Sequence, residues 1–484
     1  MKLVDAMRTE TGLTQNGMTT NTTTLNACTD LYGTIGAMRG QDKTRLIRMF
    51  SAAYAEDPMT AMRILFWARD VREGQGERQV FRDIFELFLI ANHPDVAEKN
   101  TSIIPEFGRW DDLLLAENTV FEKSVLDFIA SALRTENGLC AKWMPRKGSF
   151  ANKLRKIMSL SPKEYRQLLV GLSNTVEQKM CAKEFGAINY SHVPSLAMSR
   201  YMTAFHKQDA DRFVQFREAL KRGDAGVKVN AGAVYPYDII KSIKYGGDKT
   251  VNQKQWESLV NYLVGSKERI MPMCDVSGSM QRPVGGNKNL SALDVALSLG
   301  MYISERNEGP FKDAFISFTE KPTLQYLKGN VADRLQQFGG HIGYNTNLEA
   351  AFRSMLDHAV KHSIVQEEMP TMLLIISDME FDAFRDWDNP TAQKMVEKLY
   401  EQANAKLKAD GKDIVYVVPK TIWWKVNAMQ DNHPVQFGKT GSAVISGFSP
   451  SLMKSVLSGD LAEFTPYNVM MKTISVPRYD VVQV

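Results

Sequence analysis

Cysteine is scarce in this sequence of 484 residues, and its pattern excludes two ways of cross-linking a fold. The four cysteines, Cys28, Cys140, Cys181 and Cys274, are far apart and form no Cys-x-x-Cys pair. Structural zinc sites and disulfide frameworks need closely spaced or paired thiols, so neither is expected. Scattered free thiols are typical of a reducing compartment, and we expect a cytoplasmic protein.

Long apolar runs are also missing. None approaches the ~18 residues that a membrane-spanning helix requires. Lys2, Asp5, Arg8 and Glu10 interrupt the first ten residues, which therefore hold no apolar core of signal-peptide length. Hydrophobic residues make up 44% and charged residues 24% of the chain, so wholesale disorder is excluded. The length indicates about two to four domains.

Signatures of common enzyme classes are incomplete. Gly438-Lys439-Thr440 resembles the end of a phosphate-binding loop, but His433 stands where that loop needs a glycine. Ser277 and Ser279 lack a Gly-x-Ser-x-Gly elbow, and the seven histidines show no spacing tied to them. Because nothing supplies an activated nucleophile, we expect a protein that is not an enzyme and takes no small-molecule substrate.

The net charge of +4 hides an uneven distribution. Residues 1–141 hold 15 Lys and Arg against 20 Asp and Glu, a net charge of −5. Residues 142–267 hold 22 against 10, a net charge of +12, and residues 268–484 hold 22 against 25, a net charge of −3. Positive charge is therefore concentrated in the middle segment.

That basic segment begins with cations that alternate with aromatic residues. The candidate RNA-binding residues are Lys142, Trp143, Arg146, Lys147, Lys153, Arg155 and Lys156. Cations at this density can neutralise phosphates while Trp143 and Phe150 stack on unpaired bases. The alternative is a solvated helix face with aromatic residues in the core.

Two other charged stretches, residues 69–78 and 109–112, alternate in sign around glycines. They predict either a phosphate-binding nest or, preferably, a salt-bridged corner between two helical repeats. Asp111 is expected to cap a helix, because Asp is a preferred N-cap residue, and Trp110 to lie in the core.

Periodicity divides the chain into three parts. Residues 1–29 are rich in Thr and Asn and predict an irregular leader. Residues 30–265 show apolar residues at spacings of three and four, broken by Pro, Gly and Asn, which predicts an α-helical repeat domain. Residues 268–484 alternate strands with helices, which predicts a doubly wound, mostly parallel α/β sheet. The expected strands are 270–274, 314–319, 372–377, 413–418 and 443–445, and the expected helices are 290–306, 347–362, 391–409 and 451–457.

Polar residues follow two of these strands, and another polar residue lies in a loop before a helix. Asp275, Ser277 and Ser279 follow the first strand, Asp378 follows the strand 372–377, and Thr346 precedes the helix 347–362. Open α/β sheets bind ligands at this edge, and the hard oxygens of carboxylates and hydroxyls suit Mg²⁺. The alternative is an Asx-type turn with hydroxyl caps. The five residues therefore predict a magnesium site.

This set resembles the metal-ion-dependent adhesion site of von Willebrand factor A domains. Longer stretches are similar to the Ro-like proteins of plants, large DNA viruses and phages, and more distantly to the Ro autoantigen with its TROVE module. The matching stretches are Trp67-Ala-Arg69-Asp70-Val-Arg72-Glu-Gly74-Gln-Gly76-Glu77-Arg78, Ile104-Pro105-Glu-Phe-Gly108-Arg109-Trp110-Asp111-Asp112, Val193-Pro194-Ser195, Cys274-Asp275-Val-Ser277-Gly278-Ser279-Met280 and Ser377-Asp378-Met379-Glu380-Phe381-Asp382.

The resemblance implies a Rossmann-like A domain that clasps a ring of HEAT-like helical repeats. It also implies binding of structured or misfolded small RNA at the ring, without catalysis. The sequence departs from many A domains, because Ser-Asp-Met-Glu replaces Thr-Asp-Gly and places two extra acids, Glu380 and Asp382, beside the site.

Two functions of different classes follow. The first is a cytoplasmic RNA-binding scaffold that forms a ribonucleoprotein with small structured RNA. The alternative is a protein adaptor or chaperone whose metal site captures an acidic residue of a partner protein. A hydrolase that uses the acidic cluster is a weaker third hypothesis. The position of the cations in residues 142–267 distinguishes the first two, because RNA binding needs them on one surface.

Overall fold

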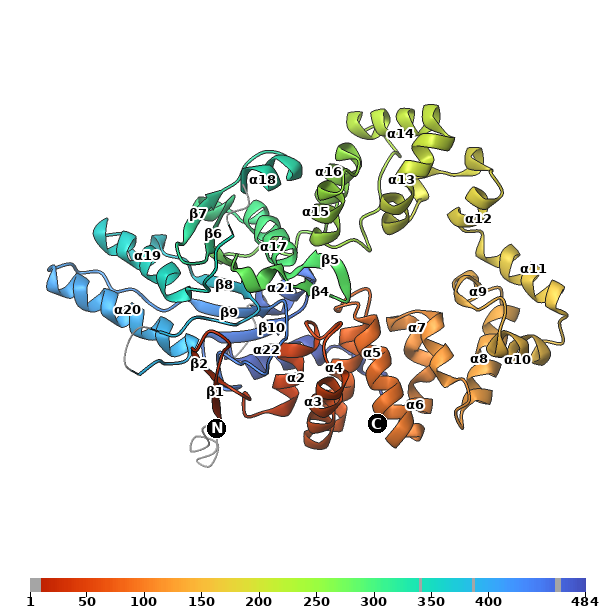
Figure 1. Cartoon of the computed structure of the whole chain (residues 1–484), viewed down its shortest axis with the longest axis horizontal. Coiled ribbons are helices and arrows are strands. Elements are labelled where there is room, and N and C mark those ends of the chain that lie inside the picture. Colours follow the sequence, from red (N-terminus) through yellow and green to blue (C-terminus); the bar gives the residue numbers. More distant parts are fainter. Residues whose placement is uncertain (1–9, 339–341, 385–387, 458–462) are drawn as a thin grey trace. The chain divides into compact units, whose positions relative to one another are not determined.

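The computed structural model describes residues 10–338, 342–384, 388–457 and 463–484 (Figure 1). It contains two compact units. The first, here called the sheet unit, comprises the described residues up to Ile64 together with 235–241 and 260–476. The second, the helical unit, comprises 65–234, 242–259 and 477–484.

These units differ from the division expected from the sequence. Helices α2 (Ala27–Ile35) and α3 (Lys43–Glu56) belong to the sheet unit although their periodicity resembles that of the helical repeats. The last eight residues belong to the helical unit. The boundary between the two predicted domains, placed between residues 265 and 268, stays a prediction.

The sheet unit is built on six strands in the order β10-β9-β8-β3-β6-β7. The strands are β3 (Ile270–Asp275), β6 (Ala314–Phe318), β7 (Thr323–Tyr326), β8 (Met372–Ser377), β9 (Lys420–Lys425) and β10 (Ser442–Ser446). All neighbours are parallel except β6 and β7. When these six strands are numbered one to six along the chain and read from β7, their order is the 3-2-1-4-5-6 of doubly wound folds. The direction of winding reverses between β3 and β8.

Helices cover both faces of this sheet. Met273 and Ile375 share an apolar core with Phe352 of α19 (Leu348–Lys361) and Leu399 of α20 (Ala392–Ala409). Cys274 faces α17 (Ala292–Arg306) on the other side. This alternation follows from the two-residue period of a strand. A Cβ atom at Gly300 of α17 would lie 2.4 Å from the Cys274 sulfur, so glycine permits the close approach. The helices are α17 (Ala292–Arg306), α18 (Val331–Phe338), α19 (Leu348–Lys361), α20 (Ala392–Ala409), α21 (Met453–Leu457) and α22 (Pro466–Ile474).

One predicted strand is wrong. Residues 413–418 are rich in β-branched residues, but they form no strand, and β9 begins at Lys420 instead. The Tyr416 and Val417 amides donate to the side chains of Asn404 and Gln366 rather than to a neighbouring strand. Pro419, which lacks an amide proton, ends this stretch. The other four expected strands and the four expected helices are confirmed to within about two residues.

Three short features were not expected. The leader, whose residues 1–9 lie outside the described part, contains the hairpin strands β1 (Thr11–Leu13) and β2 (Thr19–Asn21) rather than irregular chain. A second hairpin pairs β4 (Pro283–Val284) with β5 (Asn287–Ser291), and β7 adds an antiparallel edge. Each of these strands has five residues or fewer, too few for an alternation of apolar and polar residues to identify a strand in the sequence.

The helical unit is a succession of short helices. They are α5 (Arg78–Ile84) continued by a π-helix (Phe85–Ile90), α6 (Pro94–Asn100), α7 (Ile104–Phe107), a 3-10 helix (Trp110–Ala116), α8 (Glu122–Arg134), α9 (Gly138–Trp143), α10 (Ser149–Ile157), α11 (Pro162–Ser173), α12 (Val176–Cys181), α13 (Ser195–Gln208), α14 (Ala210–Arg222) and α16 (Lys249–Glu257). Helices α4 (Pro58–Arg69) and α15 (Pro236–Lys244) are shared with the sheet unit.

Helices of this unit pack on partners close in sequence, such as α8 with α10, α9 with α11 and α13 with α14. Local packing of this kind is typical of an α-solenoid. The predicted fold class, helical repeats followed by a doubly wound α/β domain, is confirmed, while ring closure stays an implication of the resemblance. No helix among the described residues is long and apolar enough to cross a membrane.

Candidate metal centre and nucleic-acid interface

The two predicted carboxylates lie at the point where the sheet reverses its winding. Asp275 is the last residue of β3, and Asp378 directly follows β8, the strand paired with β3. Parallel strands end at one edge, so both side chains reach the place where doubly wound sheets bind ligands. The structure thus brings the two predicted carboxylates to the same edge of the sheet.

The loop after β3 organises the first hydroxyls. The Ser277 amide donates to Asp275 Oδ1 over 2.9 Å, and the Ser277 and Ser279 hydroxyl oxygens are 3.1 Å apart. The second oxygen of Asp275 accepts a hydrogen bond from the Ser377 hydroxyl over 2.6 Å. Ser377 was not among the predicted site residues, although it immediately precedes Asp378. The loop has the Asx-turn geometry of the alternative interpretation and also aligns two hydroxyls beside a carboxylate.

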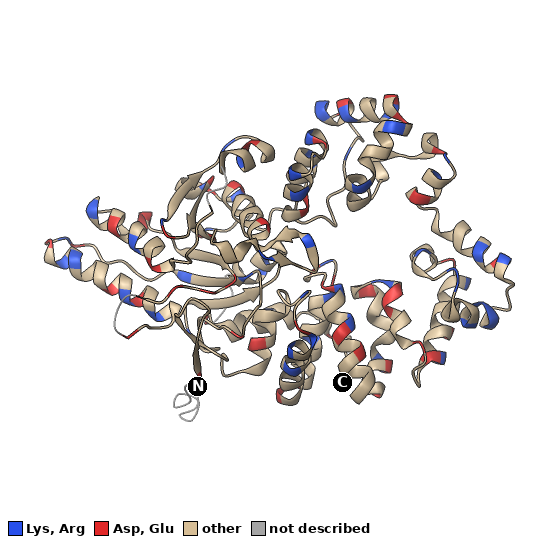
Figure 2. Cartoon of the chain, viewed as in Figure 1, with Lys and Arg blue, Asp and Glu red and all other residues tan. Residues whose placement is uncertain are grey.

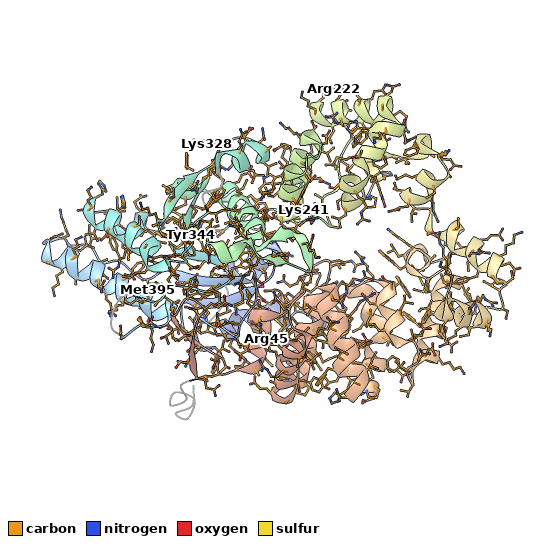
Figure 3. All side chains as sticks on the ribbon, viewed as in Figure 1. Arg45, Arg222, Lys241, Lys328, Tyr344 and Met395 are labelled. Carbon is orange, nitrogen blue, oxygen red and sulfur yellow. The ribbon has the colours of Figure 1, made fainter. Side chains whose placement is uncertain are left out.

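A second loop brings Thr346 to the same edge. The Gly343 amide donates to the Val276 carbonyl, and Gly343 forms a bridge with Ser277. Thr346 is then fixed by Asp382, because the Thr346 amide donates to Asp382 Oδ1 and the Asp382 amide donates to the Thr346 carbonyl, both over 3.1 Å. The extra acid Asp382 therefore holds the loop. Tyr344 of this loop, which Figure 3 labels, has an exposed side chain.

The electrostatics of the site favour a cation. Burial, together with repulsion by Asp378, raises the pKa of Asp275, and burial raises that of Asp378. Asp378 Oδ1 accepts from the Glu380 amide, but its buried Oδ2 has no hydrogen-bond partner among the described residues. A buried acceptor without a partner is costly, and a bound cation would satisfy it.

The donor set fits a hard cation. Two carboxylates and the hydroxyls of Ser277, Ser279 and Thr346 offer only oxygen, as Mg²⁺ prefers. The neighbouring Cys274 thiol points away, toward the Ala296 carbonyl of α17. In the ranges that the structure describes, no group of three or more His, Cys, Asp or Glu could hold a metal ion. A cation here would therefore depend on the hydroxyls as well as on the two acids.

The remaining extra acid, Glu380, is held by its neighbours. Its two carboxylate oxygens accept from the Gln15 amide over 2.7 Å and from the Asn432 side chain over 2.9 Å. The buried Lys425, whose pKa is lowered to about 8 by burial, donates to the Asn432 carbonyl. Burial raises the pKa of Glu380. Glu380 thus connects the site to the N-terminal segment.

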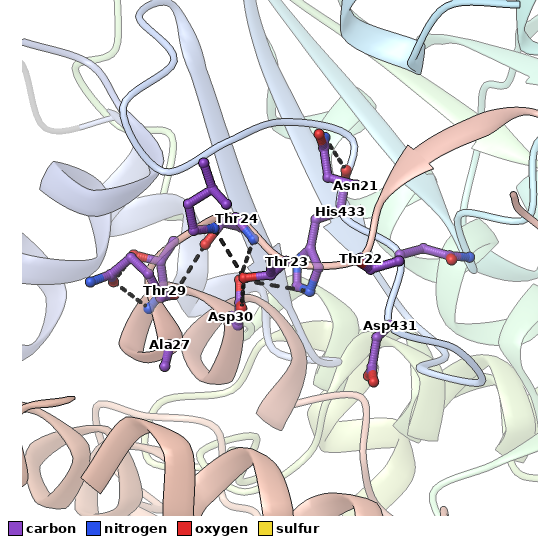
Figure 4. Close-up of polar contacts among 12 residues, drawn as sticks. Asn21, Thr22, Thr23, Thr24, Ala27, Thr29, Asp30, Asp431 and His433 are labelled. Carbon is purple, nitrogen blue, oxygen red and sulfur yellow. Dashed lines mark hydrogen bonds and ion pairs between the residues drawn. The ribbon is translucent and has the colours of Figure 1, made fainter. Parts of the chain in front are cut away.

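The same N-terminal segment is anchored further along at His433 (Figure 4). The backbones of Asn21 and His433 exchange hydrogen bonds over 3.1 and 2.9 Å, and the Asn21 side chain donates to the His433 carbonyl. Asp30 accepts from Thr23 and Thr24 and lies 3.8 Å from His433 Nε2. Burial lowers the pKa of His433, which is therefore neutral at pH 7.

In the helical unit, the predicted RNA-binding residues lie on α9, α10 and the loop between them (Figure 2). Phe150 is buried, as the alternative interpretation expected of an aromatic core residue. Trp143 is half-buried, with the Arg109 guanidinium 4.5 Å and the Lys142 ammonium 5.4 Å from its ring centroid. Arg109 was not predicted for this surface, since it lies 34 residues before Trp143 in the sequence.

Two of the six predicted cations are held by polar partners. Lys153 donates to Glu122 over 2.6 Å and to Asn118 over 3.0 Å, and Arg155 Nε donates to Asn152 over 3.1 Å. Four others are exposed and make no ion pair with any residue that the structure describes. These four are Lys142, Arg146, Lys147 and Lys156. They and Trp143 are here called the α9–α10 basic surface.

The charged stretches 69–78 and 109–112 form a salt-bridged corner, the preferred of the two interpretations. Fully buried Asp112 accepts from Arg69 over 2.6 Å and from Arg82 over 2.6 Å. Asp111 pairs with Arg78 and Arg82, so its expected role as a helix cap is wrong. Asp112 instead accepts from the Arg109 amide at the start of the 3-10 helix, and Trp110 is buried as expected.

Comparison with known proteins gives families without an assigned activity. A domain of unknown function, DUF2828, matches residues 14–116 and 122–267, over half of the chain, and another, DUF7788, matches residues 269–474. The chain is 25% identical over 520 residues to the uncharacterized protein L728 of Acanthamoeba polyphaga mimivirus, covering 95% of this chain and 86% of that one.

Among solved structures, the Ro (RSR) protein of Deinococcus radiodurans is similar over 93% of both chains, with 13% identity and a TM-score of 0.39.

Proposed function

The chain belongs to the DUF2828 family, and we propose that it is a non-catalytic RNA-binding scaffold with a magnesium site in its sheet unit. The proposed ligand is small structured RNA with unpaired nucleotides, bound on the α9–α10 basic surface. The resemblance to Ro-like proteins in the five quoted stretches supports the same class of ligand.

One observation carries this proposal. Four exposed cations without ion pairs lie in a stretch of fifteen residues of sequence that also contains a half-buried tryptophan. Exposed cations that neighbouring acids do not neutralise are available to phosphates, and their contact releases counterions. A partly exposed indole offers a face on which an unpaired base can stack. Arg109, which lies against the ring, can share the stacking, because guanidinium planes also stack on bases.

The magnesium site is proposed on the fit of its donors. Asp275, Ser277, Ser279, Thr346 and Asp378 would hold Mg²⁺, with water at the remaining positions. The cation would neutralise two buried carboxylates and fasten the loop after β3, the loop that precedes α19 and the loop after β8. Among the residues that the structure describes, no side chain beside the site supplies an activated nucleophile, so we propose a structural role rather than hydrolysis.

The salt dependence of RNA binding tests the basic surface. We expect the affinity for a hairpin RNA with a single-stranded end to fall linearly on a log–log plot against salt, with a slope of about −0.7 per contacted single-strand phosphate. Changing Arg146 and Lys147 to Ala together removes up to two contacts, so the slope should become shallower by roughly 1 to 1.5. Fluorescence anisotropy across a salt series measures this slope.

Two further variants make the result specific. The double variant Lys408→Ala, Lys412→Ala removes two exposed cations from the sheet unit and serves as the charge-matched control. Trp143→Ala should weaken binding by about 1–3 kcal/mol with little change of slope, because stacking releases no counterions. Equal slopes for the wild type, the Arg146/Lys147 variant and the control would exclude the α9–α10 surface. Unfolding of Trp143→Ala would instead assign the indole to the core.

A further inference from the structure

The residues of the candidate metal centre are almost completely shielded from solvent. The exposed fractions of Asp275, Ser277, Thr346 and Asp378 are 0%, 1%, 1% and 1%, and Ser279 is half-buried. A site that captures an acidic side chain of a partner must leave an open coordination position.

The N-terminal segment 14–18 supplies contacts to both loops of the centre. The Asn16 side-chain amide donates to Thr346 Oγ1 over 3.3 Å and to the Glu380 carbonyl over 2.6 Å. These bonds join a proposed metal ligand to the loop that follows Asp378. A ligating hydroxyl can bind a cation with one lone pair and accept from Asn16 with the other. Asn16 therefore has the position of a residue that orients a metal ligand.

Backbone and side-chain bonds hold the rest of the segment on the same loop. The Thr14 hydroxyl donates to the Phe381 carbonyl over 2.6 Å, and the Ala383 amide donates to the Asn16 carbonyl over 3.0 Å. Gly17 forms an antiparallel bridge with Asp382, the acid that fixes Thr346. The segment thus adds a short strand-like pairing to the loop after β8.

An apolar anchor completes the attachment. Met18 is 1% exposed and belongs to the core that contains Met379, Phe381 and Phe384. Burying a methionine side chain stabilises the folded state more than an exposed hydrogen bond would. The segment is therefore a packed part of the sheet unit and not a loosely attached tail.

We propose that residues 14–18 form a built-in cover of the metal centre, in which Asn16 positions Thr346 and closes the outward coordination side. This inference rests on the proposed magnesium site. Its consequence is that the cation serves the chain's own loops, while a partner's carboxylate has no access as long as the cover is in place. The cover therefore disfavours the adaptor hypothesis for the state seen in this structure.

Manganese is a suitable probe, because it takes similar oxygen ligands and is paramagnetic. We expect one Mn²⁺ per wild-type chain by isothermal titration, with a low relaxation enhancement of solvent water because the cover limits water exchange. Asn16→Ala should weaken Mn²⁺ binding by about 10- to 100-fold, as is typical when a group that orients a metal ligand is lost. The same variant should raise the water relaxation per bound Mn²⁺.

Acetate serves as a probe for access by a carboxylate. It should change the electron paramagnetic resonance spectrum of Mn²⁺ bound to Asn16→Ala and leave that of the wild type unchanged. The control is Thr22→Ala, which removes an exposed hydroxyl of the same N-terminal region that bonds the Glu10 carbonyl. Should Asn16→Ala fail to fold, Thr14→Val loosens the cover at the Phe381 carbonyl and should shift both readouts in the same direction.

The outcomes separate the two proposals. Absence of Mn²⁺ binding to the wild type would overturn the metal centre itself and the cover with it. Equal Mn²⁺ affinity and equal water relaxation in wild type and Asn16→Ala would leave the metal centre standing and overturn the cover. An acetate response in the wild type would also overturn it, because the outward side would then be open.

Discussion

Replacing Asp112 with alanine is expected to destabilise the helical unit by about 3–5 kcal/mol. Asp112 is fully buried and accepts from Arg69 Nε over 2.9 Å, from Arg82 Nε and from the Arg109 amide. The Arg69 side chain is itself only 1% exposed. Removing the carboxylate would leave that guanidinium buried without its partner, which costs far more than the loss of an exposed pair.

Urea unfolding followed by circular dichroism measures this effect, since the helices of this unit contribute strongly to the signal. Asp127→Ala is the matched control, because it removes an exposed acid from α8. Its free energy of unfolding should stay within about 0.5 kcal/mol of the wild type. A loss below about 1 kcal/mol for Asp112→Ala would show that the corner contributes no more than a surface ion pair.

Asp275→Ala is expected to abolish the stabilisation that Mg²⁺ gives the sheet unit. A ligand that binds only the folded state adds about 2.7 kcal/mol at a concentration 100 times its dissociation constant. Asp275 supplies one of the two carboxylates of the centre, and all proposed ligands belong to the sheet unit. The helical unit should therefore remain folded in the variant.

Thermal unfolding with and without Mg²⁺ tests this expectation. The control Asp357→Ala removes an acid whose side chain is 71% exposed and should keep the response to Mg²⁺. If Mg²⁺ raises the melting temperature of the wild type and of Asp275→Ala alike, the cation binds elsewhere and the proposed ligands are wrong.

The sheet was largely predictable from the sequence, because its central strands are continuous apolar runs. Such runs mark strands of parallel sheets that helices cover on both faces, as in β3 and β8. The prediction of 413–418 was wrong because local propensity does not register the absence of a pairing strand. Strand β9 begins two residues later, where Lys420 aligns with Met372.

The candidate metal centre was predictable only in part. The residues found from the sequence, such as Asp275 and Asp378, directly follow strands, so topology brings them together. Asn16, which contacts the metal centre, could not be found in this way, and neither could Arg109, which contacts Trp143 in the helical unit. Each reaches its partner through tertiary packing, Asn16 across 330 residues to Thr346, and no local period or spacing indicates such a contact. The leader was predicted to be irregular for the same reason, since its short strands depend on distant partners.

Crosslinking most directly tests the central claim that this chain binds RNA on the α9–α10 basic surface. The full chain would be irradiated with a hairpin RNA that has a single-stranded end, and crosslinked peptides would be mapped by mass spectrometry. We expect crosslinks within residues 138–157, with Trp143 among the modified residues, and their loss in the Arg146→Ala, Lys147→Ala variant. Absence of crosslinks, or crosslinks confined to the sheet unit, would contradict the claim.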